Sequence, residues 1–314
     1  MDGFIVLGDL GGTNCRLELV PLQQSAADAK GAHRPMAIHR AKYKSGSAAS
    51  LVDLLLRFLG EPECASVISG SGTDGGVIHL FSIAVCGPVT DGRAILLASV
   101  FGEGGWTVDA REMAEQLGAR VVLLNDFHAV GLALPFIPGD DLHCVHNANA
   151  GGKRDSNGIM ACLGPGTGLG EVYAVPSSTC SGGSKVNEKV DYTVCCSEGG
   201  MSEFVARTDD EWALRKHIAQ TCQDGFVEVE KVVSGEGIAN AYRWLREECP
   251  ELIVDTELDA RVLDADEPAA VIAQHDTDPL CVRSVNMFLE ALGAEAGNMA
   301  IRYQAKGGVY IAGG

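Results

Sequence analysis

The sequence predicts an α/β protein with two domains, and three observations carry this prediction. The chain has 314 residues, 46% of them hydrophobic, which is enough for two domains with separate cores. Strand-like and helical segments follow one another along the chain, and each half contains a glycine-rich turn between two strands. We place a small α/β domain at residues 1–135 and a larger one at residues 136–314.

In the first half, short apolar or alternating runs predict strands, and longer periodic runs predict helices. The run at 15–20 alternates polar and apolar residues with the period of a half-buried strand, and Ser50 is a typical N-cap for the helix after it. The expected strands are 4–8, 15–20, 36–43, 78–85, 93–99 and 121–124, and the expected helices are 51–59, 108–117 and a pattern from Phe127 to Leu134.

The second half predicts a glycine hairpin, then helices, then a last strand. Polar, glycine-rich or acidic stretches between these elements are expected to be surface loops. The strands are 159–163, 169–175 and 309–312, the helices are 210–222, 236–248 and 280–304, and the loops are 138–158, 176–191 and 251–267.

Composition excludes several classes of partner. The net charge is −18, from 24 basic and 42 acidic side chains, and no cluster of four or more Lys or Arg occurs, which argues against nucleic acid and anionic membranes as partners. No apolar run approaches the ~18 residues of a membrane span. Asp9 interrupts the first apolar stretch, so it is no signal sequence, and the eleven cysteines lack C-x-x-C spacing. We expect a cytoplasmic protein with reduced thiols.

The first glycine turn, GDLGGTN at 8–14, joins strand to strand, so it is neither a P-loop nor a dinucleotide fingerprint. Taken alone, it is an ordinary hairpin whose glycines supply positive φ. Asp9, however, lies at the mouth of a buried strand, where a cation or hydrogen bonds must compensate its charge. The glycines beside it expose backbone N–H groups that suit phosphate oxygens, which this acidic chain must bind without a basic patch.

Further polar residues stand where strands or helices meet turns. A second turn places Thr167 between Gly166 and Gly168, and the two turns together could hold one polyphosphate. Asn125 and Asp126 follow an aliphatic strand and precede a helix. On their own they are an ordinary helix cap. The same geometry would also allow the Asp126 carboxylate to accept the proton of a substrate hydroxyl. Glu198 and Glu230 are surface acids on their own, but with Asn125 and Asp126 they form a set suited to a polyhydroxylated ligand.

Six motifs in this order and spacing resemble the bacterial-type glucokinases along essentially the whole chain. They are 8–14 (GDLGGTN), 124–127 (LNDF), 163–170 (LGPGTGLG), 198–200 (EGG), 234–237 (SGEG) and 307–314 (GGVYIAGG). The resemblance implies a two-domain actin-like, ribonuclease H-like ATPase fold with an interdomain cleft. It also implies ATP between the two glycine hairpins and a sugar deeper in the cleft.

The resemblance assigns roles residue by residue. It implies that Asp126 is the base for the 6-hydroxyl of glucose and that Asp9 acts on the Mg²⁺ side. The implied sugar-binding residues are Asn125, Asp126, Glu198 and Glu230, and the implied ATP-binding residues are Asp9, Gly11, Gly12, Thr13, Gly166, Thr167, Gly168, Gly313 and Gly314. Glucose and ATP are the expected ligands, and a homodimer is a possible assembly.

The chain departs from the family pattern at three places. Met201 stands where bacterial members usually carry a sugar-contacting His, and the loop at 98–106 is longer and richer in glycine. The family continues into a helix that returns to the first domain, whereas this sequence stops at Gly314. We expect that return segment to be missing, and a C-terminal peroxisome-type signal would lie in it.

Two alternative functions stay open. One is transfer to another hexose or amino sugar, although the repressor and sugar-kinase family usually carries a Cys/His zinc motif, and no such spacing occurs here. The other is a catalytically weak regulator that binds sugar or nucleotide; the intact carboxyl and amide positions and the lack of a helix-turn-helix segment weigh against it. His143 and His146 are expected to be surface residues, not metal ligands.

Overall fold

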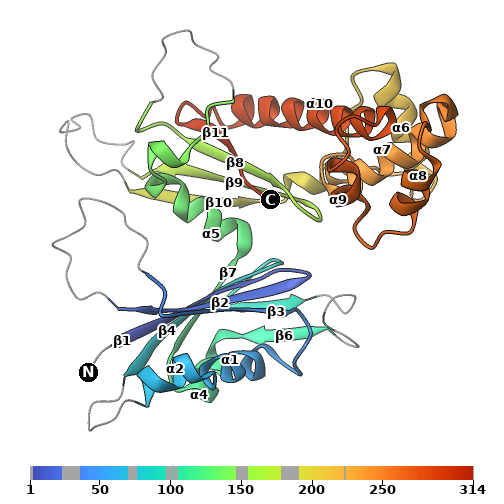
Figure 1. Ribbon diagram of the computed structural model, residues 1–314. Coiled ribbons are helices and arrows are strands. Elements are labelled where there is room, and N and C mark those ends of the chain that lie inside the picture. Colours follow the sequence, from blue (N-terminus) through green and yellow to red (C-terminus); the bar gives the residue numbers. More distant parts are fainter. Residues whose placement is uncertain are drawn as a thin grey trace. The chain divides into compact units, whose positions relative to one another are not determined.

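The computed structural model describes residues 3–22, 36–69, 76–96, 101, 105–145, 155–177, 191–222 and 224–313. Contacts divide the chain into two compact units, Met1–His143 and Cys144–Gly314 (Figure 1). Within the described ranges, no helix is long and apolar enough to cross a membrane.

The sheet of the first unit has five strands in the order β3-β2-β1-β4-β7. Their bounds are β1 Gly3–Leu10, β2 Asn14–Pro21, β3 His39–Lys44, β4 Val77–Val85 and β7 Arg120–Asn125. Strands β1, β2 and β3 pair antiparallel, whereas β1, β4 and β7 run parallel. The carboxyl ends of the three parallel strands therefore meet at one edge, because Leu10 is level with Val85 and Val85 with Asn125.

Helices α1 (Leu51–Leu59), α2 (Pro62–Ile68) and α4 (Ala110–Leu117) lie on one face of this sheet (Figure 1). Ser50 caps α1 as predicted, since its Oγ accepts from Asp53 N at 3.1 Å. Phe58 of α1 and Phe81 of β4 are fully buried, and each such side chain contributes roughly 1.5–3 kcal/mol of transfer free energy. The small sheet β5 (Arg93–Leu96) with β6 (Trp106–Asp109), helix α5 (Asp126–Ala133) and two short 3-10 helices, η2 (Leu134–Phe136) and η3 (Gly139–Asp141), complete the unit.

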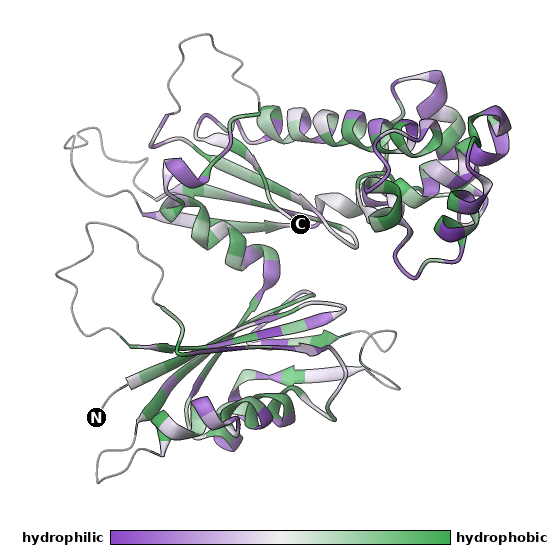
Figure 2. Ribbon diagram, in the orientation of Figure 1, coloured by the Kyte–Doolittle hydropathy of each residue, from purple (hydrophilic) through white to green (hydrophobic). Residues whose placement is uncertain are grey.

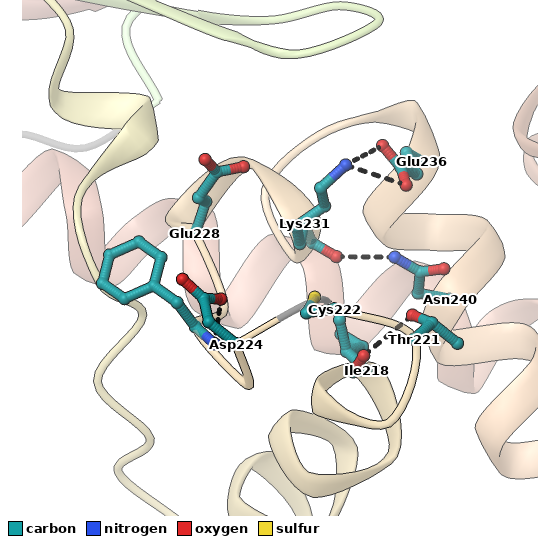
Figure 3. A pocket seen from close by; sticks show the side chains of 9 residues that line it. Ile218, Thr221, Cys222, Asp224, Glu228, Lys231, Glu236 and Asn240 are labelled. Carbon is teal, nitrogen blue, oxygen red and sulfur yellow. Dashed lines mark hydrogen bonds and ion pairs between the residues drawn. The ribbon is translucent and has the colours of Figure 1, made fainter.

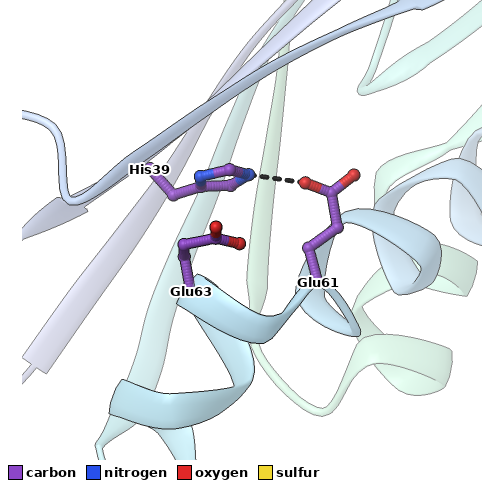
Figure 4. A group of neighbouring side chains, drawn as sticks. All are labelled: His39, Glu61 and Glu63. Carbon is purple, nitrogen blue, oxygen red and sulfur yellow. Dashed lines mark hydrogen bonds and ion pairs between the residues drawn. The ribbon is translucent and has the colours of Figure 1, made fainter.

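A His39–Glu61–Glu63 cluster lies where β3 meets the start of α2 (Figure 4). Their potential ligand atoms lie within 4.8 Å of one another. Both oxygens of Glu61 are already engaged, one by His39 Nε2 and the other by the hydroxyl of Tyr43. These hydrogen bonds hold the pKa of Glu61 below its usual value. The cluster therefore ties helix to strand without needing an ion.

The sheet of the second unit has four strands in the order β10-β9-β8-β11. They are β8 Met160–Pro165, β9 Leu169–Pro176, β10 Tyr192–Ser197 and β11 Gly308–Ile311. Strands β8, β9 and β10 pair antiparallel, and β11 adds to the sheet parallel to β8. This arrangement matches that of β1, β2, β3 and β4 in the first unit. Each glycine turn joins the first two strands of its sheet, and Figure 2 shows the apolar character of strands in both sheets.

Helix α10 (Pro279–Arg302) lies along one face of this second sheet, and α7 (Gly235–Glu248) and α9 (Pro268–Ala273) pack against it (Figure 1). Helices α6 (Asp209–Ala219) and α8 (Thr256–Leu263) belong to the same helical cluster. The short 3-10 helices η4 (Gly199–Met201), η5 (Val229–Lys231) and η6 (Pro250–Leu252) lie between longer elements. The core contains buried Tyr242, Leu214 and Met299.

The prediction of a surface loop at 251–267 was wrong, because η6 and α8 occupy much of it. Asp255 caps α8 by accepting from Glu257 N at 3.0 Å and Leu258 N at 2.9 Å. Leu258 and Val262 are buried. One of the acids of this segment, Asp259, is neutralised by Arg246, whose Nε donates to the Asp259 carboxylate at 2.8 Å.

Other boundaries shift by a few residues. The predicted helix 108–117 begins at Ala110, because residues 106–109 form β6 and Asp109 is the cap. Strand β5 ends at Leu96, and residues 97–100 lie outside the described ranges. Strand β10 and helices α2 and α9 were not predicted. The loop at 176–191 falls largely outside the described residues, as do residues 146–154 of the loop at 138–158.

Candidate active site

The first glycine turn connects β1 to β2 and is held from behind by Ser45. Gly11 N donates to Asn14 O at 3.0 Å and closes the turn. Ser45 N donates to Thr13 O at 3.0 Å, and Ser45 Oγ donates to Gly11 O at 2.6 Å. The carbonyls of Gly11, Thr13 and Asn14 are thus engaged by hydrogen bonds, while residues Gly12 and Thr13 remain exposed. Such a turn can present N–H groups to an anion. Sequence reasoning missed Ser45, because no local pattern marks it.

Asp9 lies on β1 just before this turn and has a partner that sequence reasoning missed. Arg16 Nη1 donates to Asp9 Oδ2 at 2.9 Å, and both side chains are at least half exposed, 61% for Arg16 and 50% for Asp9. The hairpin register places the two residues opposite each other. The Asp9–Arg16 pair could have been found from the sequence, because the length of the turn sets the register of the hairpin. At this exposure the pair contributes little stability, so the Asp9 carboxylate stays accessible.

Asp126 stands where β7 ends and α5 begins, as the sequence predicted. Its Oδ1 accepts from Phe127 N at 2.8 Å and from Asn125 Nδ2 at 3.1 Å. Asn125 is the N-cap of α5, accepting from His128 N at 3.0 Å, and its Nδ2 also donates to Gly87 O at 3.1 Å. Asn125 therefore fixes the orientation of the Asp126 carboxylate, and among the described residues no hydrogen bond engages Oδ2 of Asp126.

The electrostatics of this sheet edge raise the pKa of Asp126. Burial raises its pKa above the ordinary aspartate value, the N–H of Phe127 acts in the opposite direction, and the charge of Asp9 raises the pKa further. Cys86, directly after β4, lies between the two acids, and burial with the charge of Asp126 raises the pKa of its thiol. The first unit thus brings together Asp9, the exposed turn, Asn125 and Asp126. Catalytic acids and bases often have shifted pKa values, so the raised pKa of Asp126 makes it a candidate acid–base residue.

The second glycine turn connects β8 to β9 and is tied to the start of α7. Gly166 N donates to Gly168 O at 2.8 Å, and Gly235 N donates to Gly166 O at 2.9 Å. Ser234 caps α7, with its Oγ accepting from Gly237 N at 3.1 Å and donating to Glu230 O at 2.5 Å. Gly166 and Thr167 are exposed. This turn therefore resembles the first: the carbonyls of Gly166 and Gly168 are engaged by hydrogen bonds, and its tip is exposed.

Glu230 contacts this same turn. Its Oε2 accepts from Leu169 N at 3.1 Å. A Cβ at position 168 would collide with that carboxylate, so Gly168 leaves room for Glu230 to pack against the turn. Glu230 thus holds the beginning of β9 with one oxygen and can offer the other to a ligand.

Glu198 precedes η4, and its side chain is exposed. The turn it begins packs on the start of β9, because a Cβ at Gly200 would collide with the carbonyl of Leu169. Val229 N donates to Ser202 O at 2.8 Å and joins η5 to this turn. The second unit therefore places the Glu230 carboxylate at the amide of Leu169 and the turn that follows Glu198 at the carbonyl of Leu169.

Gly313 follows β11 beside the same hairpin. Ala312 N donates to Leu163 O at 2.9 Å, and Gly313 has φ +124°, with a hypothetical Cβ 2.7 Å from Pro165 O. Only glycine fits that position. Gly314 and His146 lie outside the described residues. Met201 is 55% exposed, which is consistent with a surface that a ligand could cover.

A polar hollow of about 370 Å³ lies on the second unit, lined by residues of α6, η5 and α7 and the segments beside them (Figure 3). Lys231 Nζ donates to both oxygens of Glu236, at 3.1 and 2.9 Å, and Asn240 Nδ2 donates to Lys231 O at 3.0 Å. None of the predicted site residues lines it. The hollow is therefore separate from the candidate site.

Comparison with known proteins settles the family. The glucokinase family profile matches residues 6–314. The chain belongs to the glucokinase family. It is therefore a kinase, an enzyme that transfers phosphoryl groups. A glucokinase from Synechocystis sp. is 32% identical to it over 320 residues, covering 98% of this chain and 82% of the relative.

Solved structures confirm the predicted actin-like fold. The crystal structure of a glucokinase from an Antarctic psychrotroph has a TM-score of 0.68 and 25% identity, covering 99% of this chain and 83% of that one. A ROK family glucokinase from Streptomyces griseus, solved with glucose and AMPPNP, has a TM-score of 0.58 and 18% identity, with coverage of 99% and 83%. The family and fold predicted from the motifs are thus confirmed.

Proposed function

We propose that this member of the glucokinase family transfers the γ-phosphoryl group of ATP to the 6-hydroxyl of glucose, with Asp126 as the general base. The observation that carries the proposal is the placement of Asp126 at the carboxyl edge of the parallel strands, with one oxygen held and its pKa raised. The similar fold of the Streptomyces griseus enzyme, solved with glucose and an ATP analogue, supports the choice of ligands.

Asp126 accepts the proton of the attacking hydroxyl as the phosphoryl group moves. A base is most effective when its pKa lies near the working pH, and burial moves Asp126 in that direction. Asn125 and Phe127 N hold Oδ1, so that Oδ2 can point at the hydroxyl. Such positioned bases contribute roughly 10² to 10⁴-fold to rate.

The two exposed glycine turns hold the phosphates of ATP. Gly11, Gly12 and Thr13 supply N–H groups in one turn, and Gly166, Thr167 and Gly168 supply them in the other. Hydrogen bonds hold both turns in place, from Ser45 to the carbonyls of Gly11 and Thr13 in the first and from Gly235 N to the carbonyl of Gly166 in the second. Backbone donors suit this acidic chain, and fixed dipoles stabilise the charge that develops during phosphoryl transfer. Gly313 and Gly314 approach the adenosine.

Glucose is held by Asn125, Glu198 and Glu230 together with Asp126. Carboxylates accept hydrogen bonds from sugar hydroxyls. The exposed side chain of Glu198 and the second oxygen of Glu230 provide such acceptors beside Leu169. Asn125 uses its amide mainly to orient Asp126 and cap α5.

The acids of the first unit fit Mg²⁺. Mg²⁺ takes hard oxygen ligands, usually one or two carboxylates plus waters and substrate phosphates. Asp9 offers an accessible carboxylate whose charge already raises the pKa of Asp126, so a cation there would lower the repulsion. Asp9 would hold the ion, which would supply positive charge to balance that of the phosphates. Location in the cytoplasm and assembly as a homodimer stay predictions.

A coupled assay for ADP and glucose 6-phosphate tests this function. The parent protein should turn over glucose with ATP and Mg²⁺, and 6-deoxyglucose should bind competitively without being phosphorylated. The same assay with polyphosphate tests the donor. No turnover of glucose with any donor, or ADP release that 6-deoxyglucose stimulates as well as glucose does, would contradict the assignment.

A second candidate is transfer to another hexose or an amino sugar, and Met201 favours testing it. A thioether is a weak acceptor and cannot donate a hydrogen bond, and it stands exposed next to the Glu198–Gly200 segment. A panel of hexoses and amino sugars in the same assay ranks these substrates by kcat/KM. A higher kcat/KM for a sugar other than glucose would favour this candidate.

A further inference from the structure

Glu171 is a buried acid with no assigned role. It lies on β9, is only 1% exposed, and faces Ser197 across the β9–β10 pairing. Ser197 Oγ donates to Glu171 Oε2 at 3.2 Å, whereas Oε1 is buried and lacks a partner among the described residues. Burial and the charge of Glu295 raise its pKa.

A neighbouring buried acid provides a contrast. Glu295 on α10 is 5% exposed, but Arg302 Nη1 and Asn298 Nδ2 donate to it at 2.9 and 2.8 Å. Its burial is therefore compensated within its own helix. A buried polar group with an unmade hydrogen bond destabilises the folded state, so an apolar residue at 171 would serve packing better than Glu171 does.

Glu171 lies directly under the segment that carries Glu198. A Cβ at Gly199 would collide with Glu171 Oε2. Gly199 N donates to Ser197 Oγ at 3.0 Å, and that hydroxyl in turn donates to Glu171. One hydroxyl can donate once and accept as well. Glu171, Ser197 and Gly199 thus form a continuous chain of hydrogen bonds.

The carbonyl of Gly199 is held by other residues than its amide. Ser202 Oγ donates to Gly199 O at 2.7 Å, and Ser202 N donates to the same oxygen at 3.0 Å. The peptide groups of Gly199 are therefore held at both ends, at the carbonyl by Ser202 and at the amide by Ser197. Only the amide end depends on Glu171.

We propose that Glu171 is a positioning residue of the sugar site, which acts through Ser197 on the amide of Gly199 and thereby fixes the backbone that presents Glu198. It does not touch the substrate. The inference rests on the proposed function, in which Glu198 binds glucose. Losing this chain should weaken glucose binding selectively, because the ATP-binding turns have their own anchors in Ser45 and Gly235.

Four variants test the proposal: Glu171→Ala, Glu171→Gln, Ser197→Ala and, as a matched control, Glu295→Gln. The first readout is amide hydrogen exchange at Gly199 in the unliganded protein. Exchange should be at least about tenfold faster in E171A and S197A, since a tenfold change corresponds to about 1.4 kcal/mol. It should stay near the parent rate in E171Q, whose amide oxygen still accepts from Ser197, and in E295Q.

The second readout is steady-state kinetics with thermal melts of each variant. E171A and S197A should raise KM for glucose about tenfold or more, with kcat and KM for ATP little changed, and E171Q should restore the parent KM. An unchanged exchange rate at Gly199 in E171A would overturn the proposal. So would a glucose KM that rises in E295Q as much as in E171A for the same loss of melting temperature, because the effect would then be one of stability. A parent protein inactive on glucose would overturn the proposed function instead, while hydrogen exchange would still decide the role of Glu171.

Discussion

Asp9 and Asp126 stand at the same edge of the first unit's sheet, on β1 and after β7, and the charge of Asp9 raises the pKa of Asp126. Burial is the larger cause of the shift. The relationship couples the residue proposed to hold Mg²⁺ to the residue proposed to accept the proton.

The substitution Asp9→Asn should lower the pKa of Asp126. Removing a nearby negative charge makes ionisation of Asp126 easier, while burial keeps its pKa above the ~3.9 of a free aspartate. Because the base works only when ionised, its protonation curve should move to lower pH. Carboxyl carbon NMR of Asp126 in the metal-free protein measures this midpoint. Glu115→Gln, an exposed acid on α4, is the control. An Asp126 titration midpoint that is the same in D9N and in the parent would contradict the electrostatic coupling of the two residues.

The substitution Glu230→Ala should affect both substrates, whereas Glu230→Gln should affect only the sugar. Ala leaves Leu169 N without its acceptor, which costs roughly 1–3 kcal/mol of unfolding free energy. It also loosens the second glycine turn, so KM should rise for ATP and for glucose. Gln retains an acceptor for Leu169 N but loses the charge offered to the sugar. Denaturant unfolding and the two KM values separate these effects; identical behaviour of E230A and E230Q would argue against the double role.

The substitution Met201→His should strengthen glucose binding. It places a hydrogen-bonding ring at an exposed position beside Glu198, and one net hydrogen bond contributes about 0.5–1.5 kcal/mol. KM for glucose should fall roughly two- to tenfold. Met201→Leu serves as the control for side-chain size and should leave KM unchanged. Equal shifts in both variants would mean that hydrogen bonding is not the cause.

The substitution Asp255→Ala should lower the unfolding free energy by about 1 kcal/mol, because it removes the cap of α8. Asp266→Ala, at an exposed neighbouring position, should have little effect. KM for both substrates should be unchanged in each variant. Thermal and urea unfolding measure the difference, and equal stability of D255A and the parent would show that the cap does not hold α8.

Local chemistry accounts for what the sequence predicted well. The two glycine turns, Ser50 as a cap and Asn125–Asp126 at a strand end all depend on residues within a few positions of each other. Turn and capping preferences are local properties, so a single sequence reveals them. The prediction for the acidic segment at 251–267 was wrong although local signals were present, because its acidic composition was given more weight. Asp255 is a cap, and Leu258 and Val262 are buried at helical spacing. The compensation of Asp259 by Arg246, 13 positions away, is a tertiary contact that the sequence does not reveal.

The residues that hold the candidate site in place could not be predicted in the same way. Ser45 reaches the first turn from 34 positions away, and Glu230 reaches Leu169 from 61 positions away. Their pairing is set by tertiary packing. Glu171 gave one signal, a charged residue among apolar neighbours on β9, but only the fold shows that it lies beneath Gly199.

The most direct test of the account is Asp126→Asn, compared with Glu115→Gln in steady-state assays and in glucose titration by calorimetry. Asn keeps the acceptor for Phe127 N but cannot take the proton. The account predicts that D126N binds glucose with nearly the parent dissociation constant while kcat falls by about 10² to 10⁴-fold, and that E115Q matches the parent in both. A D126N protein that folds, binds glucose and turns over at a rate close to the parent would contradict it.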